Sequence, residues 1–271
     1  MESYPNLYSI RREWPLSLND VADAPSDTEV LRVEAKCKNF NRLPELQHLR
    51  RIHCSRITKD KLSVLSQCTS LEEVYLDNLS TDTLAPFQNL RSLRLLNIES
   101  WHDAESLESL AMFHSLSALG VTNCKNIHSI KTIKELVGLN ALIVSGSIWT
   151  RMDIDTLAPL SDLTYLRYLD LTNLKVADES LRPLEHLTAL EQLEIANFYP
   201  MHEFARLSQA LPKTRCRWLK PYTDYTTIPC RSCDKPRLVM PSGKGTRIMC
   251  QDCDRKRLDK HLEKWAKAIA S

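Results

Sequence analysis

The sequence predicts an α/β protein in which strand–turn–helix units stack into a solenoid, followed by a small metal-binding module and a final helix. Three observations support this prediction: a leucine pattern that returns along most of the chain, a Leu-x-Pro phrase between its copies, and two Cys-x-x-Cys pairs near the C-terminus. The 271 residues are 43% hydrophobic and 26% charged, which is ordinary for a folded protein. No apolar run approaches the roughly 18 residues of a membrane span.

The leucine pattern, Leu-x-x-Leu-x-Leu with some apolar replacements, predicts the strands. Its copies begin at Leu71, Leu90, Leu116, Leu139, Leu166 and Leu190, with a weaker copy at Leu49. The steps between first leucines are 22, 19, 26, 23, 27 and 24 residues. Successive strand residues point to opposite faces, so the two ends of Leu-x-Leu share one face. Each copy therefore predicts a short strand with one apolar side.

The segments between these strands predict short helices. Residues 83–87, 156–160 and 180–184 repeat one phrase in which a proline follows the leucine by two positions. Proline is tolerated in a first helical turn, and the aspartates just upstream are typical of N-caps. A single unit cannot bury its own apolar face, so neighbouring units must share one core.

With this pattern and spacing, residues 28–219 resemble a leucine-rich-repeat solenoid, whose repeats are about 20–29 residues long. The resemblance implies parallel strands on the concave face and short helices outside. We expect residues 1–27 to form an N-terminal cap in which Trp14 covers the first repeat. The chain departs from the family at the turn after each strand, where Cys124 is the one match. Asparagine stands one place earlier instead, either in tight turns or as a polar ladder, at Asn78, Asn97, Asn123, Asn173 and Asn197.

The residue between the two inward-facing positions of each strand should point to the concave face. From first repeat to last it reads Arg32, His53, Tyr75, Arg94, Gly120, Ile143, Asp170 and Glu194. Aromatic residues and arginine are enriched at protein interfaces. We therefore predict a protein or peptide partner on this face, contacted by Arg32, His53, Tyr75, Arg94 and Tyr168. The alternative is a solvated sheet face that binds nothing.

The two cysteine pairs predict a metal site. Cys230/Cys233 and Cys250/Cys253 are separated by sixteen residues. This spacing is typical of one tetrahedral Zn²⁺, with redox chemistry of the dithiols as the rival. Residues 220–253 resemble a zinc ribbon, with two strands around the turn at 241–245. Four thiolates close the coordination sphere, so the zinc should be structural rather than catalytic.

A basic amphipathic helix is expected over residues 254–271. Leu258, Leu262, Trp265 and Ile269 form one apolar stripe. From residue 213 onward there are 15 basic and 6 acidic side chains, against 21 and 28 before it. Clustered basic residues neutralise phosphates, so a nucleic-acid-binding protein is the alternative function. Its contacts would come from Arg237, Lys244, Arg247, Arg255, Lys256 and Arg257; otherwise these residues are solvated surface.

No catalytic motif is found in the sequence. The Gly243–Thr246 run lacks the frame of a phosphate-binding loop, and no Gly-x-Ser-x-Gly elbow is present. No secretory signal precedes Trp14, and nine cysteines are an odd number. We therefore expect a cytoplasmic, non-enzymatic recognition protein with structural Zn²⁺, no membrane association and no small-molecule substrate.

Overall fold

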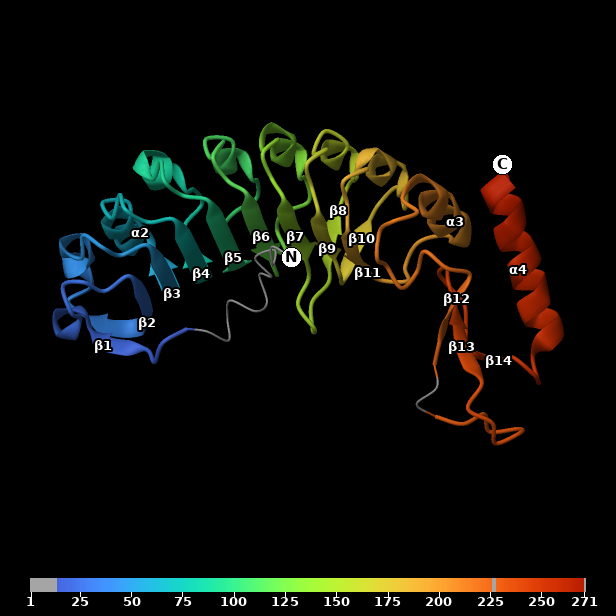
Figure 1. The fold of residues 1–271 in the computed structure, drawn as a ribbon. Coiled ribbons are helices and arrows are strands. Elements are labelled where there is room, and N and C mark those ends of the chain that lie inside the picture. Colours follow the sequence, from blue (N-terminus) through green and yellow to red (C-terminus); the bar gives the residue numbers. More distant parts are fainter. Residues whose placement is uncertain (1–13, 226–227, 271) are drawn as a thin grey trace.

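The structure, a computed structural model, describes residues 14–225 and 228–270. Figure 1 shows a curved solenoid with the strands side by side on its inner surface and short helical turns on its outer surface. Within the described residues, nine strands form one sheet in the order β1-β2-β3-β4-β5-β6-β7-β9-β11, and the neighbouring pairs are parallel. The predicted leucine-rich-repeat solenoid is therefore confirmed.

The strands of this sheet begin at regular intervals along the chain. They are β1 (Leu18–Asp20), β2 (Val30–Lys38), β3 (Arg51–Thr58), β4 (Glu73–Ser80), β5 (Leu95–Trp101), β6 (Ala118–Thr122), β7 (Ala141–Ser145), β9 (Tyr168–Leu171) and β11 (Gln192–Ile195). A second, two-stranded parallel sheet pairs β8 (Met152–Ile154) with β10 (Leu174–Val176). One apolar cluster runs through the whole array, from Val21 in the first turn to Leu211 after the last repeat.

The outer surface consists mostly of 3-10 helices. These are η2 (Val21–Asp23), η3 (Phe40–Glu45), η4 (Ala85–Asn89), η5 (Glu108–Leu110), η6 (Lys131–Glu135), η7 (Ala158–Leu160) and η8 (Arg182–His186). Two α-helices, α2 (Lys59–Leu65) and α3 (Met201–Ala210), replace such turns. A connection of three to six residues is too short for a ladder of i→i+4 bonds, and the tighter 3-10 turn fits it. None of the described helices is long and apolar enough to cross a membrane.

The register of β5 differs from the prediction. Its inward residues are Leu96 and Ile98, which pair with Val74 and Leu76 of β4. This repeat therefore begins at Leu93, and the first five copies follow one another at 22, 22, 23 and 23 residues. The sequence allows both frames because Leu90, Leu93 and Leu96 stand three residues apart. In the correct frame Asn97, not Arg94, occupies the concave row between Tyr75 and Gly120.

One residue after most strands adopts a left-handed conformation, with φ between 52° and 62°. These residues are Arg56, Asn78, Ser100, Asn123 and Asn173. The tight-turn interpretation is therefore confirmed for three asparagines and wrong for Asn97, whose place in the turn Ser100 takes. A polar ladder exists as well, since Nδ2 of Asn123 donates to Oγ of Ser100 at 2.8 Å and Nδ2 of Asn173 donates to the oxygen of Thr150 at 3.3 Å.

The N-terminal cap is described only from Trp14 onward, because residues 1–13 lie outside the described residues. Strand β1 pairs with β2 and Val21 joins the core, so this part does cover the first repeat. Trp14 does not cover it. Its ring packs on the concave face against His53 and Tyr75.

Replacing Gly120 with alanine should destabilise the solenoid. Gly120 is buried in β6, and a Cβ there would overlap Oδ1 of Asn97, whose side chain is buried beside it. We expect the free energy of unfolding in urea to fall by about 1–3 kcal/mol because the packed amide must move. Gly138→Ala is the matched control, since its Cβ would meet nothing closer than 3.6 Å. Equal losses in the two variants would contradict the steric explanation.

Candidate functional site

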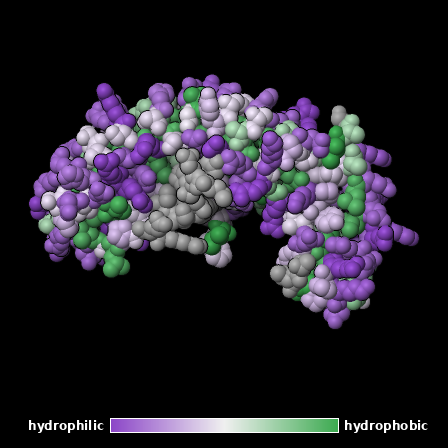
Figure 2. Space-filling view, viewed as in Figure 1, coloured by the Kyte–Doolittle hydropathy of each residue, from purple (hydrophilic) through white to green (hydrophobic). Residues whose placement is uncertain are grey.

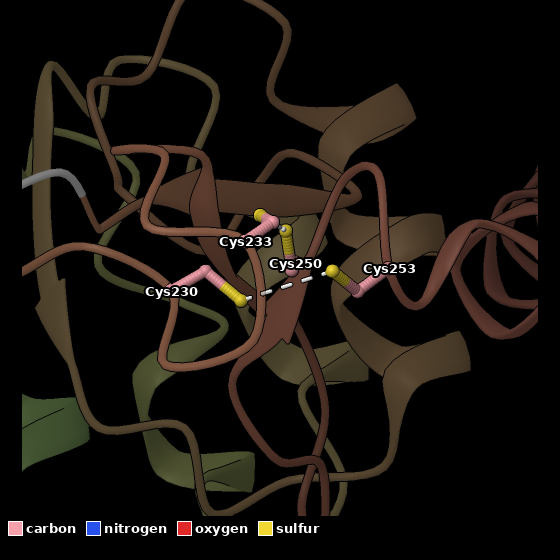
Figure 3. Close-up of side chains that lie close together, drawn as sticks. All are labelled: Cys230, Cys233, Cys250 and Cys253. Atoms are coloured by element: carbon pink, nitrogen blue, oxygen red, sulfur yellow. Dashed lines mark hydrogen bonds between the residues drawn. The ribbon is translucent and has the colours of Figure 1, made fainter.

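The four cysteines converge in the C-terminal module (Figure 3). Strands β12 (Tyr222–Asp224), β13 (Leu238–Pro241) and β14 (Met249–Cys250) form an antiparallel sheet, which is one strand more than predicted. Cys230 and Cys233 lie in the loop before β13. Cys250 ends β14, and Cys253 lies just before α4 (Arg255–Ala270). All four Sγ atoms lie within 4.8 Å of one another.

The sulfur separations fit a tetrahedral metal ion. Sγ of Cys230 lies 3.9 Å from Sγ of Cys253, and Sγ of Cys233 lies 3.7 Å from Sγ of Cys250. A tetrahedron with Zn–S bonds of about 2.3 Å has edges of about 3.8 Å. A disulfide needs about 2.05 Å, so these sulfurs are not bonded to one another. The donor set can therefore hold one ion between two cysteines from each pair.

The charge balance of the four thiols also favours a cation. Backbone N–H groups of Ser232 and Cys233 lower the pKa of Cys230 to about 7, and the N–H of Ser232 lies 3.4 Å from its sulfur. The neighbouring thiol of Cys233 raises the pKa of Cys253 to about 12. Four thiolates at these distances repel one another, and a divalent cation would remove that repulsion.

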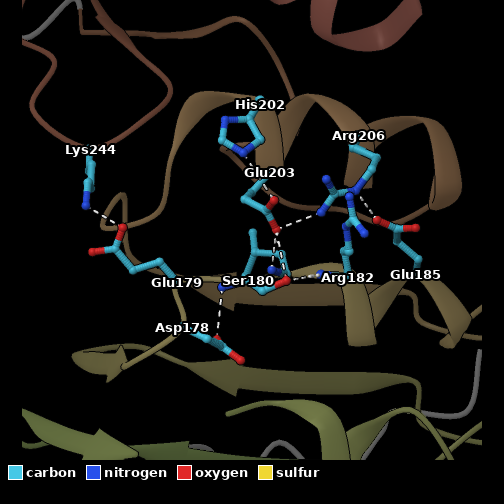
Figure 4. A network of polar contacts seen from close by, with 10 residues as sticks. Asp178, Glu179, Ser180, Arg182, Glu185, His202, Glu203, Arg206 and Lys244 are labelled. Carbon is cyan, nitrogen blue, oxygen red and sulfur yellow. Dashed lines mark hydrogen bonds and ion pairs between the residues drawn. The ribbon is translucent and has the colours of Figure 1, made fainter. Parts of the chain in front are cut away.

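The module is docked on the last repeat through its turn at 241–245. Asn197, which follows β11, accepts a hydrogen bond from the N–H of Gly243 at 2.6 Å and donates to the oxygen of Pro241 at 3.1 Å. The N–H of Lys244 donates to the oxygen of Tyr199 at 2.7 Å, and its Nζ pairs with Glu179, as Figure 4 shows. Asn197 thus does for the module what Asn123 and Asn173 do between repeats.

Helix α4 joins the module to the solenoid and stands beside α3 in Figure 1. Leu258 packs with Val239 and Met249 of the small sheet, whereas Trp265 is part of the solenoid core. Nε2 of His261 donates to the oxygen of Pro221 at 2.8 Å. The predicted apolar stripe therefore packs on both the module and the last repeat.

A polar network holds α3 on the preceding repeat (Figure 4). Glu203 is buried, and its Oε2 accepts hydrogen bonds from the N–H of Leu181 at 2.5 Å and from Nη2 of Arg206 at 2.7 Å. Arg206 also pairs with Glu185. The carboxylate therefore satisfies the start of η8, which is a structural role.

Three of the five predicted partner contacts lie together on the concave face, here defined as the outward row Arg32, His53, Tyr75, Asn97, Gly120, Ile143, Asp170 and Glu194 with its neighbours in the same strands. Arg32, His53 and Tyr75 are consecutive in this row, and Tyr75 is only 1% exposed. Tyr168 lies further along the sheet and packs against the cluster that contains Tyr75 and Ile143.

Arg94 belongs to a different feature. It precedes β5 and pairs with Glu72, which also accepts an ion pair of 2.6 Å from Arg50. Arg167 and Glu191 pair at 3.6 Å in the same position of later repeats. Arg94 is thus one member of an ion-pair row along the edge where the strands begin.

The structure also reveals an exposed apolar turn that the sequence analysis missed. Ile148 and Trp149 follow β7 and are 87% and 89% exposed. The turn is ordered by Ser147, whose N–H donates to the oxygen of Thr150 at 2.8 Å and whose Oγ accepts from the N–H of Thr150 at 2.9 Å. It projects from the concave side in Figure 1, and apolar surface projects at this place in Figure 2. The 27-residue step from Leu139 was the available signal, since the steps before it are 22 or 23 residues.

The six basic residues of the nucleic-acid alternative are mostly paired with acidic neighbours. Arg237 lies 3.4 Å from Asp252, Arg257 lies 3.0 Å from Asp254, and Arg255 lies 4.0 Å from Asp259. Lys244 pairs with Glu179, whereas Arg247 and Lys256 are exposed. Paired charges release fewer counterions on binding a phosphate backbone. The nucleic-acid alternative stays a prediction.

Comparisons with known proteins show a distant likeness. No protein-family model matches the chain, and no curated protein matches it. Among solved structures, an internalin C2 from Listeria monocytogenes has a TM-score of 0.44 and 19% identity, over 58% of this chain and 72% of that one. A second internalin from the same organism has a TM-score of 0.40 and 19% identity, over 64% of this chain. The match spans 62% of that second structure's length. By its own parallel sheet, repeats and core, the chain is a leucine-rich-repeat solenoid that ends in a four-cysteine module and a helix.

Proposed function

We propose that this protein is a non-enzymatic recognition protein that binds a polypeptide partner on its concave face. The observation that carries the proposal is the turn with Ile148 and Trp149, because an ordered turn places two large apolar side chains in water. Tryptophan is the residue type most enriched at interface hot spots, and exposed apolar surface marks interaction sites. Arg32, His53, Tyr75 and Tyr168 supply further contacts on the face, with Arg94 at its edge.

The metal in this proposal is one structural Zn²⁺, held by Cys230, Cys233, Cys250 and Cys253. All-thiolate sites select zinc among the common divalent ions, and a closed sphere leaves no position for water. The ion would stabilise a three-stranded sheet that is too small to fold on its own core. The module at 220–253 and the helix at 254–271 then act as the C-terminal cap of the repeats at 28–219, opposite the N-terminal cap at 1–27.

A cytoplasmic location is part of the same proposal. Burial raises the pKa of Cys68 to about 12 and that of Cys124 to about 11, so these thiols are inert core residues. The nine cysteines are free thiols, and reduced thiols and zinc–thiolate sites are typical of reducing compartments.

Site-specific photo-crosslinking in the source cells tests the partner proposal. We expect a benzophenone side chain placed at Trp149 or at Tyr168 to trap the same polypeptide, identified by mass spectrometry. The matched control position is Val137, which is 55% exposed on the outer side of the same repeat. Equal trapping from Val137, or none from the two concave positions, would contradict the concave assignment. A nuclease-sensitive product trapped from Lys256 would favour nucleic-acid binding instead.

A further inference from the structure

Trp14 occupies a slot on the concave face that is built by residues of other strands. Its ring centroid lies 5.5 Å from that of His53 and 5.0 Å from that of Tyr75, the latter in an edge-on arrangement at 77°. The guanidinium of Arg51 lies 5.4 Å from the same ring, within cation–π range. The three partners belong to β3 and β4, whereas Trp14 precedes β1. The chain therefore passes β2 to bring this side chain onto the face.

The slot continues into an open pocket of about 320 Å³. Its lining consists of Trp14, Arg32, His53, Asp77 and Glu99. Arg32 is paired with Glu34 at 2.9 Å, and Arg51 is paired with Glu73 at 3.1 Å. The carboxylates of Asp77 and Glu99 therefore face the space beside the ring. They favour a cationic neighbour next to an aromatic side chain in the slot.

Ring contacts are the main attachment of Trp14. Within residues 14–225 and 228–270 its Nε1–H is buried without a hydrogen-bond partner. Leu16, on the way to β1, is 96% exposed and adds no packing. A buried indole N–H usually finds a partner, so this position is a compromise for Trp14. Another aromatic side chain with a better-placed donor can therefore compete for the slot.

We propose that Arg51, His53 and Tyr75 form an anchor site for an aromatic side chain of a partner polypeptide, with basic residues beside that aromatic. In the free protein Trp14 occupies the anchor site as an internal competitor. The chain's own sequence has the same character, because Arg11 and Arg12 stand just before Trp14. This inference rests on the proposed function, because it names the chemistry of a partner bound on the concave face.

A fluorescent peptide with the sequence of residues 9–17 is the probe for this site. Its affinity for the full chain is measured by anisotropy in the wild type and in Trp14→Ala. We expect the peptide to bind Trp14→Ala at least tenfold more tightly, because a site that is nine-tenths occupied lowers the apparent affinity tenfold. The same peptide with alanine in place of its tryptophan should lose at least tenfold. Trp149→Ala is the matched control and should bind as the wild type does.

The location of the site is tested on the Trp14→Ala background. Adding His53→Ala, a half-buried substitution, should weaken the peptide at least tenfold again. Equal affinity for wild type and Trp14→Ala would overturn the proposal, as would binding that does not depend on the peptide's tryptophan or on His53. If the peptide fails while positions 149 and 168 still trap a partner, the concave face binds that partner without this anchor. If both fail, the proposed function fails as well.

Discussion

Replacing Cys250 with serine should remove the metal and unfold residues 222–270, leaving the repeats folded. Cys250 is buried, and its sulfur lies 3.7 Å from that of Cys233. Structural zinc sites contribute roughly 10–16 kcal/mol of binding free energy in small peptides, and here that energy supports a sheet with few core residues. Metal analysis should find about one zinc per chain in the wild type and almost none in the variant. Limited proteolysis should then cleave within the module.

Cys216→Ser is the matched control for this experiment. Cys216 is half-buried at the end of the repeats, outside the four-sulfur site, and burial raises its pKa to about 11. We expect this variant to keep its zinc and its protease resistance. A Cys250→Ser protein that retains one tightly bound zinc, or a module that resists protease without the metal, would refute the assignment.

Replacing Trp265 with alanine should detach α4 from the solenoid without releasing the metal. Trp265 is 4% exposed and packs in the same core as the repeats. Removing a buried tryptophan side chain costs about 3–5 kcal/mol, because the transferred area is lost and a cavity stays behind. Hydrogen exchange should report faster opening of α4 amides, and the urea midpoint should fall. The zinc content should not change, because no predicted ligand lies on α4.

Ile269→Ala provides the comparison on the same stripe. Ile269 is 37% exposed, so we expect a change of at most about 0.5–1 kcal/mol. Similar losses for the two variants would mean that α4 does not anchor the cap through Trp265. Loss of zinc in Trp265→Ala would show that the metal site needs the docked helix.

The metal site was predictable because its chemistry is local. Each Cys-x-x-Cys pair places two sulfurs on one turn, and the sixteen residues between the pairs are enough for a hairpin return. Where the module sits was not predictable. Asn197 contacts Gly243 across 46 residues, and no local pattern announces that contact. The turn at 241–245 finds its place because Asn197 presents both a donor and an acceptor where the array of repeats ends.

The sequence by itself determined the repeat, since leucines at a period of two require strands that bury one face together. It left the frame of β5 open, because Leu90, Leu93 and Leu96 satisfy the same local pattern. Pairing with β4 and β6 selected Leu93 and placed Asn97 rather than Arg94 on the concave face. Only the tertiary structure decided that Trp14 lies on that face, because ring packing depends on residues brought together by the curvature of the array.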